Sequence, residues 1–445
     1  MNQPLAISLI IVQALICWLL LRPIEPSTRA RTVWERYANP ASVFGAFYAV
    51  FFLLPQVYGA FADFHIISYE DTSVPLRFEV FLQAQIWSTL FVASVLVGST
   101  AASVRRRRGS HPHSNRGSRF NLESTFDLSG YQHLALRIYF LVGIAAYVLL
   151  AREFASINGF RSELVKTPRG QALTALGFVA NYAVAVYAAR LLFRRRYIQA
   201  ILLILPFSLA VLATGSRGRI LWPLLIALVV ANGFKPGFSR AAKTVAVSLG
   251  TLALLIFDPI SAVLRGEQEV DVLAGLDLSR LFEKRNFDGF ANFARIVNDS
   301  QAQPDVDVLF QGARGTFMNE FFPEIFASGV GFGATIPGWF ALAVGLPGML
   351  VLGGAYGLSL GFLQHLHARA ESVAARAAFL FFLSWYAAVG GNFVESLDKL
   401  VAAVVPGVVV LALATLAQRR HQYPVITHTP NPDMPSRTLT GVVTK

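Results

Sequence analysis

Long apolar segments separated by short polar stretches dominate the chain. Eleven of them approach the roughly 20 residues that a helix needs to cross the hydrocarbon core of a bilayer. They are residues 5–21, 42–61, 80–97, 134–150, 172–192, 198–213, 220–231, 245–257, 346–363, 377–389 and 400–416. Helices are the expected spanning form, because the segments lack the two-residue alternation of a barrel strand and lipid offers no partners for backbone groups. The pattern predicts an all-α polytopic membrane protein with about 11 transmembrane helices.

The composition agrees with a membrane protein. Hydrophobic residues make up 54% of the chain and charged residues 14%, whereas soluble proteins carry about 25% charged residues. The mean hydropathy is +0.52. With a single cysteine, Cys17, internal disulfides and cysteine-ligated metal sites are excluded. The expected location is therefore a membrane.

Basic residues are concentrated in every second loop. These loops carry Arg22, Arg29, Arg31 and Arg36, then residues 105–108 with Arg116 and Arg119, then 194–196, then Lys235, Arg240 and Lys243, and finally Arg419 and Arg420. Because cytoplasmic loops are enriched in lysine and arginine, this alternation predicts a periplasmic N-terminus and a cytoplasmic C-terminus. It also explains much of the net charge of +12, so no nucleic-acid partner is expected.

The same pattern divides the chain into four regions. Residues 1–257 are predicted to hold membrane helices 1–8, and residues 340–418 helices 9–11. Residues 258–339 form one long periplasmic loop with short helices, and residues 419–445 a disordered cytoplasmic tail. The leader before the first helix has no positive charge, so we expect a retained helix rather than a cleaved signal peptide. Long ordered loops are usually functional.

The turn after residue 213 is the most informative outer segment. It reads Thr214-Gly215-Ser216-Arg217-Gly218-Arg219, and it precedes a predicted helix whose N-terminus favours an anion. Glycines permit close approach of a ligand to the backbone, and arginines bind phosphate oxygens in pairs. The turn therefore predicts a phosphate site, although an interfacial hairpin with snorkelling arginines would have the same sequence. Other outer cations that could bind a diphosphate or glycan are Arg161, Arg169 and Arg314.

A second outer motif places Arg285 and Asp288 three residues apart, on one face of a helix. The two side chains form either a local salt bridge or a diphosphate contact in which Asp288 orients Arg285. A third motif, Asp305-Val306-Asp307, resembles the metal-binding pair of glycosyltransferases that use nucleotide sugars. It lies outside, where those sugars are absent, so we expect no metal and no cofactor.

Glycine and proline accumulate between Thr335 and Gly354. That density is typical of a broken or re-entrant helix packed tightly against its neighbours, in which the small residues serve either helix packing or direct contact with a ligand.

Four short motifs resemble the bacterial oligosaccharide repeat-unit polymerases, the O-antigen polymerase (Wzy-type) family. They are Asn39-Pro40 before the second helix, the Gly215–Gly218 turn, the Arg285–Asp288 segment and the Gly345–Gly348 entry to a later helix. The chain departs from the family at Trp339, where many members carry glutamate, and around Gly312-Ala313-Arg314. The resemblance implies catalytic roles for Arg217 and Arg285 and a weaker claim for Arg314.

The resemblance also implies a location, the bacterial inner (cytoplasmic) membrane, and a reaction. A glycan on undecaprenyl diphosphate would be transferred to a second lipid-linked repeat unit at the periplasmic face, with arginines rather than a metal stabilising the leaving diphosphate. The implied partners are that lipid-linked oligosaccharide, the lipid bilayer and a chain-length regulator. Two alternatives are an O-antigen ligase, which would use a histidine that residues 258–339 lack, and a lipid-linked sugar transporter, which predicts inverted repeats.

Overall fold

The computed structural model describes residues 3–22, 39–61, 65–66, 74–75, 77–109, 128–156, 167–212, 214, 217–234, 289–298, 304–311, 317, 321, 335–369, 373–386, 405, 409 and 412. Its elements in chain order are α1 (Gln3–Leu21), α3 (Pro40–Tyr48), η1 (Ala49–Leu53), α4 (Leu54–Phe61), β1 (His65–Ile66), β2 (Val74–Pro75), α5 (Phe78–Gly109), α7 (Gly130–Ser156), α9 (Pro168–Phe193), α10 (Tyr197–Leu212), α11 (Arg217–Phe234), α14 (Gly289–Asn298), α15 (Val308–Gln311), α18 (Ile336–Arg369) and α19 (Val373–Tyr386). Strands β1 and β2 form a two-residue antiparallel bridge. The rest of this part of the chain is almost entirely helical.

Six helices within these ranges are long and apolar enough to cross a membrane. They are α1, the continuous run Pro40–Phe61, α5, α7, α9 and α18. Two shorter apolar helices, Tyr197–Leu212 and Val373–Leu383, accompany them. The all-helical, multi-pass character predicted from the sequence is therefore confirmed. The predicted segment 245–257 and most of 400–416 lie outside the described residues.

The second span starts at the Asn39-Pro40 motif. The side-chain oxygen of Asn39 accepts a hydrogen bond from the backbone N–H of Ala41 at 3.0 Å, and Pro40 occupies the first turn, where its missing N–H costs nothing. The run Pro40–Phe61 contains one π-helical turn, η1, between α3 and α4. Such turns widen a helix locally and are frequent near functional sites.

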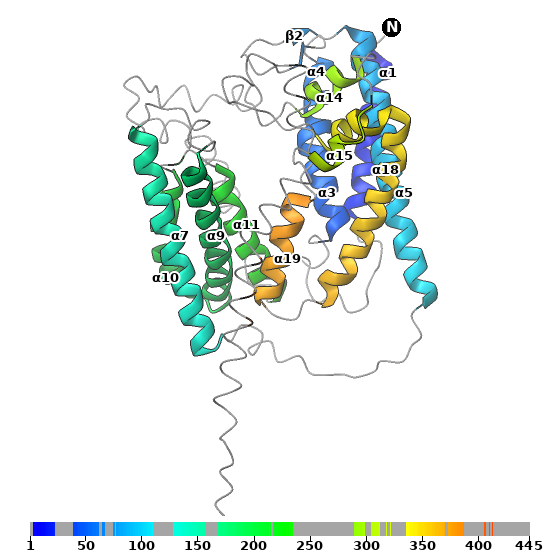
Figure 1. The fold of residues 1–445 in the computed structure, drawn as a ribbon. Coiled ribbons are helices and arrows are strands. Elements are labelled where there is room, and N and C mark those ends of the chain that lie inside the picture. The colour runs from blue at the N-terminus through cyan, green and yellow to red at the C-terminus, as the bar shows by residue number, and fades with distance from the viewer. Residues whose placement is uncertain are drawn as a thin grey trace, which may run out of the picture.

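Helices α5 and α18 lie side by side and approach one another through glycines (Figure 1). A Cβ atom added at Gly98 would lie 2.1 Å from the carbonyl oxygen of Gly354, and one at Gly357 would lie 2.2 Å from that of Val95. Only glycine therefore permits these two backbones to touch, which is the small-residue packing expected between membrane helices.

Helix α18 is broken at Gly345, where φ is +75° and ψ is 170°. Before the break, residues 336–344 form a short helix that packs against α15. The indole N–H of Trp339 donates to the carbonyl oxygen of Val308 at 2.8 Å, and the backbone N–H of Asp305 donates to that of Leu342 at 3.0 Å. Both expectations for this stretch hold, because the helix is broken and its later part packs through small residues. The short helix occupies part of the region predicted as loop.

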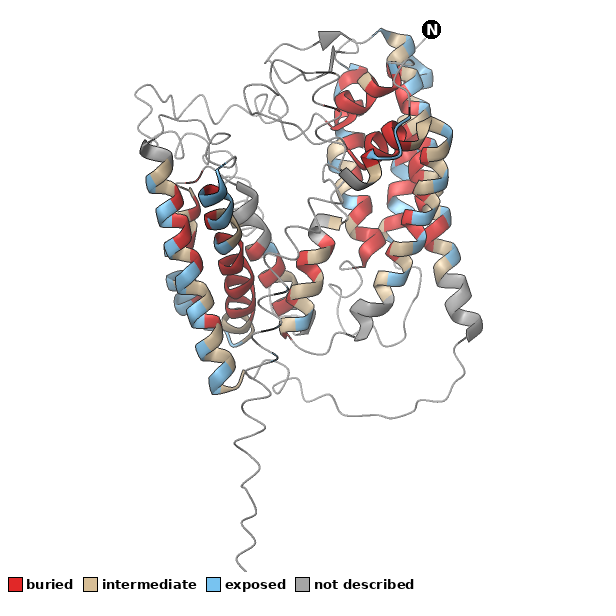
Figure 2. Ribbon diagram, in the orientation of Figure 1, coloured by how far each residue is buried: buried red, intermediate tan, exposed pale blue. Residues whose placement is uncertain are grey.

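Helix α9 is the centre of a second group of helices that contains α7, α10 and α11. Most of α9 is buried (Figure 2). Helix α19 joins this group to α18: the Tyr182 hydroxyl of α9 donates to the carbonyl oxygen of Ala374 at 3.0 Å, and the Tyr356 hydroxyl of α18 donates to that of Tyr386 at 2.8 Å.

The helix ends fall at two opposite ends of the molecule. Helix α7 ends, α9 and α11 begin, and α14 lies at the upper end in Figure 1, whereas α5 and α9 end and α7 begins at the lower end. The arginine-rich residues 105–108 and 194–196 therefore share the lower end, which the sequence assigns to the cytoplasm.

Candidate functional site

Three helix ends lie at the upper end of the α9 group (Figure 1). Leu150 in α7 and Leu173 in α9 belong to one buried apolar cluster, and Ile220 in the first turn of α11 packs against that cluster. Apolar packing thus holds the final part of α7 against the first part of α9, and α11 also packs on α9. Any charged side chains on these three helix ends are brought to one side of the molecule.

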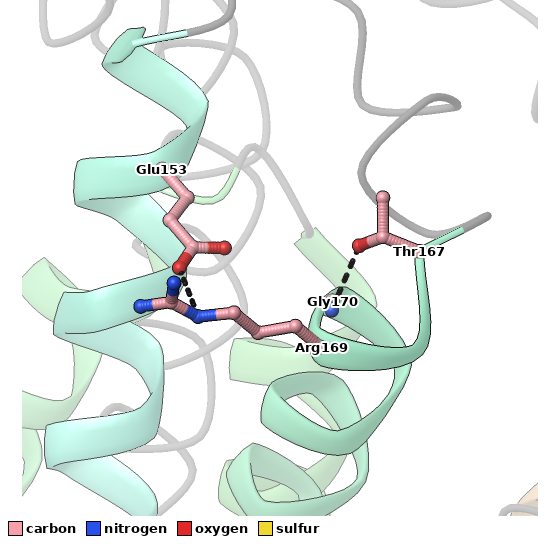
Figure 3. A network of polar contacts seen from close by, with 4 residues as sticks. All are labelled: Glu153, Thr167, Arg169 and Gly170. Carbon is pink, nitrogen blue, oxygen red and sulfur yellow. Dashed lines mark hydrogen bonds and ion pairs between the residues drawn. The ribbon is translucent and has the colours of Figure 1, made fainter.

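The start of α9 has a well-defined cap. The Thr167 hydroxyl accepts a hydrogen bond from the backbone N–H of Gly170 at 3.0 Å, and Pro168 is the first helical residue (Figure 3). Threonine as the cap and proline in the first position both favour a helix start. The cap fixes where α9 begins and therefore where the next residue, Arg169, projects.

Arg169 is the one predicted substrate-binding residue whose side chain is described. Its Nε lies 2.6 Å from a carboxylate oxygen of Glu153 at the end of α7 (Figure 3). The Arg169 side chain is 75% exposed, whereas that of Glu153 is 19% exposed. The guanidinium is thus oriented by a carboxylate on the neighbouring helix while most of its surface faces outward.

The turn before α11 is described in part. Thr214 is buried, and its hydroxyl donates to the carbonyl oxygen of Val211 at 2.7 Å, which closes the end of α10. Arg217, Gly218 and Arg219 then form the first turn of α11. Gly215, Ser216 and Arg161 lie outside the described residues, as do the side chains of Arg217 and Arg219.

The geometry suits recognition of an anion. Helices α9 and α11 run in the same direction and start at the same end, so the positive ends of both helix dipoles face the same side (Figure 1). Arg169 is the second residue of α9, and Arg217 is the first of α11. A diphosphate has the charge and the acceptor oxygens that such an arrangement binds.

No family model, curated protein or solved structure matches the chain.

The second arginine motif precedes a helix of the other group. Arg285 and Asp288 lie outside the described residues, but α14 begins at the next position, Gly289. Phe290 of α14 packs edge-on against Phe81 of α5, with ring centroids 5.4 Å apart. The structure thus places α14 on α5 and α11 on α9, and the catalytic roles of Arg217 and Arg285 stay predictions. Arg314 is also outside the described residues.

The acidic pair near α15 has a local structural role. A side-chain oxygen of Asp305 accepts a hydrogen bond from the backbone N–H of Asp307 at 2.9 Å, and both residues are exposed. The carbonyl oxygen of Asp305 accepts from the backbone N–H of Val308, the first residue of α15. Within the described ranges, no group of three or more histidine, cysteine, aspartate or glutamate side chains could hold a metal ion.

Glu153 was missed by the sequence analysis, which ended the fourth apolar segment at residue 150. Helix α7 continues to Ser156, so Glu153 is a helical residue on an interhelical face rather than a loop residue. The signal available was a single carboxylate at the outer end of an apolar helix, beside a loop rich in arginine. Such a carboxylate is a natural partner for one of those arginines.

Proposed function

We propose that the protein is a polymerase of oligosaccharide repeat units carried on undecaprenyl diphosphate. The observation that supports this function best is the pairing of two helix N-termini, those of α9 and α11, each carrying arginine in its first turn. A membrane protein with such a group at one end of its helices is suited to a ligand that combines a lipid tail with a diphosphate. The four sequence motifs of the polymerase family point to the same substrate.

The proposal includes about eleven spans with the N-terminus in the periplasm and the C-terminus in the cytoplasm. In this orientation the N-termini of α9 and α11 face the periplasm, together with α14. The arginine-rich ends of α5 and α9 face the cytoplasm, in accord with the positive-inside rule. Reporter fusions after Gly233 and after Gly289 are expected to report cytoplasm and periplasm, respectively. The reverse result would remove the site from the face where lipid-linked glycans are polymerised.

The proposed chemistry is glycosyl transfer. A hydroxyl oxygen of the acceptor repeat unit forms a bond to the anomeric carbon of the donor glycan. The bond from that carbon to the diphosphate breaks, its electron pair stays on the phosphate oxygen, and the hydroxyl proton is released to water at the outer face. Arg217, Arg285 and Arg169 would stabilise the charge that develops on the diphosphate. A well-placed donor of this kind contributes about 3 kcal/mol to the transition state.

The length of the glycan made in cells tests this function. Arg217→Ala is expected to reduce the product to single repeat units, because loss of about 3 kcal/mol slows transfer at least a hundredfold. Arg22→Ala is the matched control, since it removes an arginine from the opposite end of the molecule, where the guanidinium stacks on Trp18. Long chains in a normally produced Arg217→Ala variant would contradict the proposal.

A lipid-linked sugar transporter is the second candidate, and one observation favours it. Buried amides lie within membrane spans: the Gln13 amide nitrogen donates to the Gln56 side-chain oxygen at 2.9 Å and lies 2.8 Å from the Thr89 hydroxyl. The nearby Gln85 amide is buried, and both of its polar atoms lack a partner in the described part of the structure. Polar groups at this depth are typical of transport paths.

Purified protein in vesicles separates the two candidates. A transporter would move a fluorescent lipid-linked saccharide between leaflets without lengthening the glycan. The polymerase would lengthen the glycan on one face and leave its leaflet unchanged.

A further inference from the structure

Three of the candidate membrane spans share a buried group of polar side chains. Gln13 comes from α1, Gln56 from α4, and Gln85, Ser88 and Thr89 from α5, and all five are buried. Gln85 is the eighth residue of α5, so it lies about 10 Å along the axis from the start of that helix. These side chains carry no charge, so they form a neutral polar cluster, the glutamine cluster, at a depth where lipid surrounds the protein.

The hydrogen bonds within the glutamine cluster are short of donors around Gln13. The Gln13 amide nitrogen lies 2.8 Å from the Thr89 hydroxyl, 2.9 Å from the Gln56 side-chain oxygen, and 3.2 Å from both the Ser88 hydroxyl and the Gln85 carbonyl oxygen. An amide nitrogen carries two hydrogens, so it can form good hydrogen bonds to only two of these four oxygens. The cluster therefore has acceptors for a further donor.

The Gln85 side chain has the opposite need as well. It is fully buried, and neither its nitrogen nor its oxygen has a hydrogen-bond partner among the described residues. Burying an unpaired amide costs several kcal/mol in an apolar environment, and hydrocarbon around the helices supplies no partner. This amide requires a ligand that both donates and accepts a hydrogen bond.

The start of α14 covers the glutamine cluster. The Phe290 ring of α14 packs edge-on against Phe81, with centroids 5.4 Å apart, and against Phe52, with centroids 6.2 Å apart. Phe81 lies one turn before Gln85 on α5, which runs downward in Figure 1, and Phe52 lies about one turn before Gln56, where the chain runs upward. Phe290 is therefore level with the two glutamines, and all three rings are fully buried.

We propose that the glutamine cluster binds an ordered water molecule within the membrane, beside the Gln85 amide and under the Phe290 ring. Water supplies both donors and an acceptor, and buried waters in proteins bond to two to four otherwise unpaired polar groups. A cation would use only the amide oxygen and leave the N–H groups unpaired. The three buried phenylalanine rings enclose the cluster, which favours the smallest ligand with both functions. The site does not depend on the proposed polymerase activity.

Radiolytic labelling of the full-length protein in lipid vesicles tests the proposal. A short X-ray pulse splits water into hydroxyl radicals, which modify the side chains next to each water molecule, and mass spectrometry locates the modified residues. Phe290 and Phe81 should be labelled although they are fully buried. Phe91 is the matched control, because it is equally buried on α5 but packs against Phe44 and Phe340. It should stay unlabelled.

Gln85→Met separates a bound water from bulk water that reaches the rings from the end of the helices. This variant keeps the size of the side chain and removes its polar atoms, so the labelling of Phe290 should fall to that of Phe91. The proposal is overturned if Phe290 and Phe81 are no more labelled than Phe91 in the unmodified protein. It is also overturned if their labelling persists in Gln85→Met.

Solid-state NMR of the unmodified protein gives an answer even if Gln85→Met does not fold. Magnetisation should pass from water to the side-chain N–H groups of Gln85 at mixing times that leave the backbone N–H of Ala185, buried in α9, without signal. Equal absence of transfer at both positions would show that the Gln85 amide is dry.

Discussion

The helices around α5 bury a cluster of glutamine side chains, whereas the helices around α9 carry charged side chains at the two ends of their group. The α5 group buries Gln13, Gln56 and Gln85 within membrane spans and brings α5 and α18 into backbone contact through glycine. The α9 group fills most of its interior with alanine, valine and aromatic side chains, and it also buries a hydrogen bond from the Tyr147 hydroxyl to the Asn181 side-chain oxygen at 2.9 Å. The ion pair between Arg169 and Glu153 lies at one end of this group, and the contact of Arg190 with the His133 ring lies at the other.

This difference bears on function. An interior held by amides and glycines fixes helix positions, because each contact tolerates little change in shape. A mostly apolar interior without charged side chains leaves charge-based chemistry to the helix ends, where water and lipid headgroups are available. We therefore expect substitutions in the α5 group to act first on folding, and those at the ends of the α9 group to act first on ligands.

The largest effect is expected at the contact of α5 with α18. Gly357→Ala places a methyl group 2.2 Å from the Val95 carbonyl oxygen, so the helices must separate, at a cost of about 3 kcal/mol. Gly354→Ala is the matched control, because its methyl group would meet the Ser94 carbonyl oxygen at 3.9 Å, an ordinary contact. Unfolding by SDS titration measures both variants. Equal stability of the two would show that glycine does not set the distance between these helices.

A smaller effect is expected inside the α5 group. Gln13→Leu removes an amide that donates to Gln56 and accepts from it, and the buried Gln56 amide is then left without this partner. The expected loss of stability is about 2 kcal/mol. Gln3→Leu on the same helix is the control. Gln3 is exposed and bonds only the Ala60 carbonyl oxygen in the described structure, so its loss should be below about 0.5 kcal/mol.

The cap of α9 comes next. Thr167→Ala removes the hydroxyl that accepts from the Gly170 N–H, and loss of such a cap costs about 1 kcal/mol. Thr167→Ser retains an equivalent hydroxyl and should restore stability. In glycan-length assays the alanine variant should also shorten the product, since Arg169 follows the cap directly. Unchanged stability and glycan length in Thr167→Ala would show that the cap does not position this end of α9.

The positions of the helices could be predicted better than their contacts. Nine of the eleven predicted segments overlap described helices, because length and hydropathy are local properties of the chain. The Glu153–Arg169 pair joins two helices and depends on how α7 packs on α9. This packing cannot be predicted from any local sequence pattern. The π-turn at 49–53 was also missed, because its apolar residues fit several helical registers equally well. The broken helix near Gly345 was expected, but its first part starts at Ile336, inside the region predicted as loop.

The smallest expected effect concerns the ion pair at the candidate site, and it separates structure from function most clearly. Arg169 is largely exposed, so a double-mutant cycle with Arg169→Gln and Glu153→Gln should give a coupling of about 0.5 kcal/mol to stability. If the guanidinium binds diphosphate, Arg169→Gln must shorten the glycan far more than this small loss of stability explains. Glu153→Gln keeps the guanidinium and removes only its orienting carboxylate, so its effect on glycan length should be intermediate. If both variants and the unmodified protein make glycans of equal length, the pair is only a surface ion pair. This end of the α9 group would then have no part in the reaction, like the interior of the group.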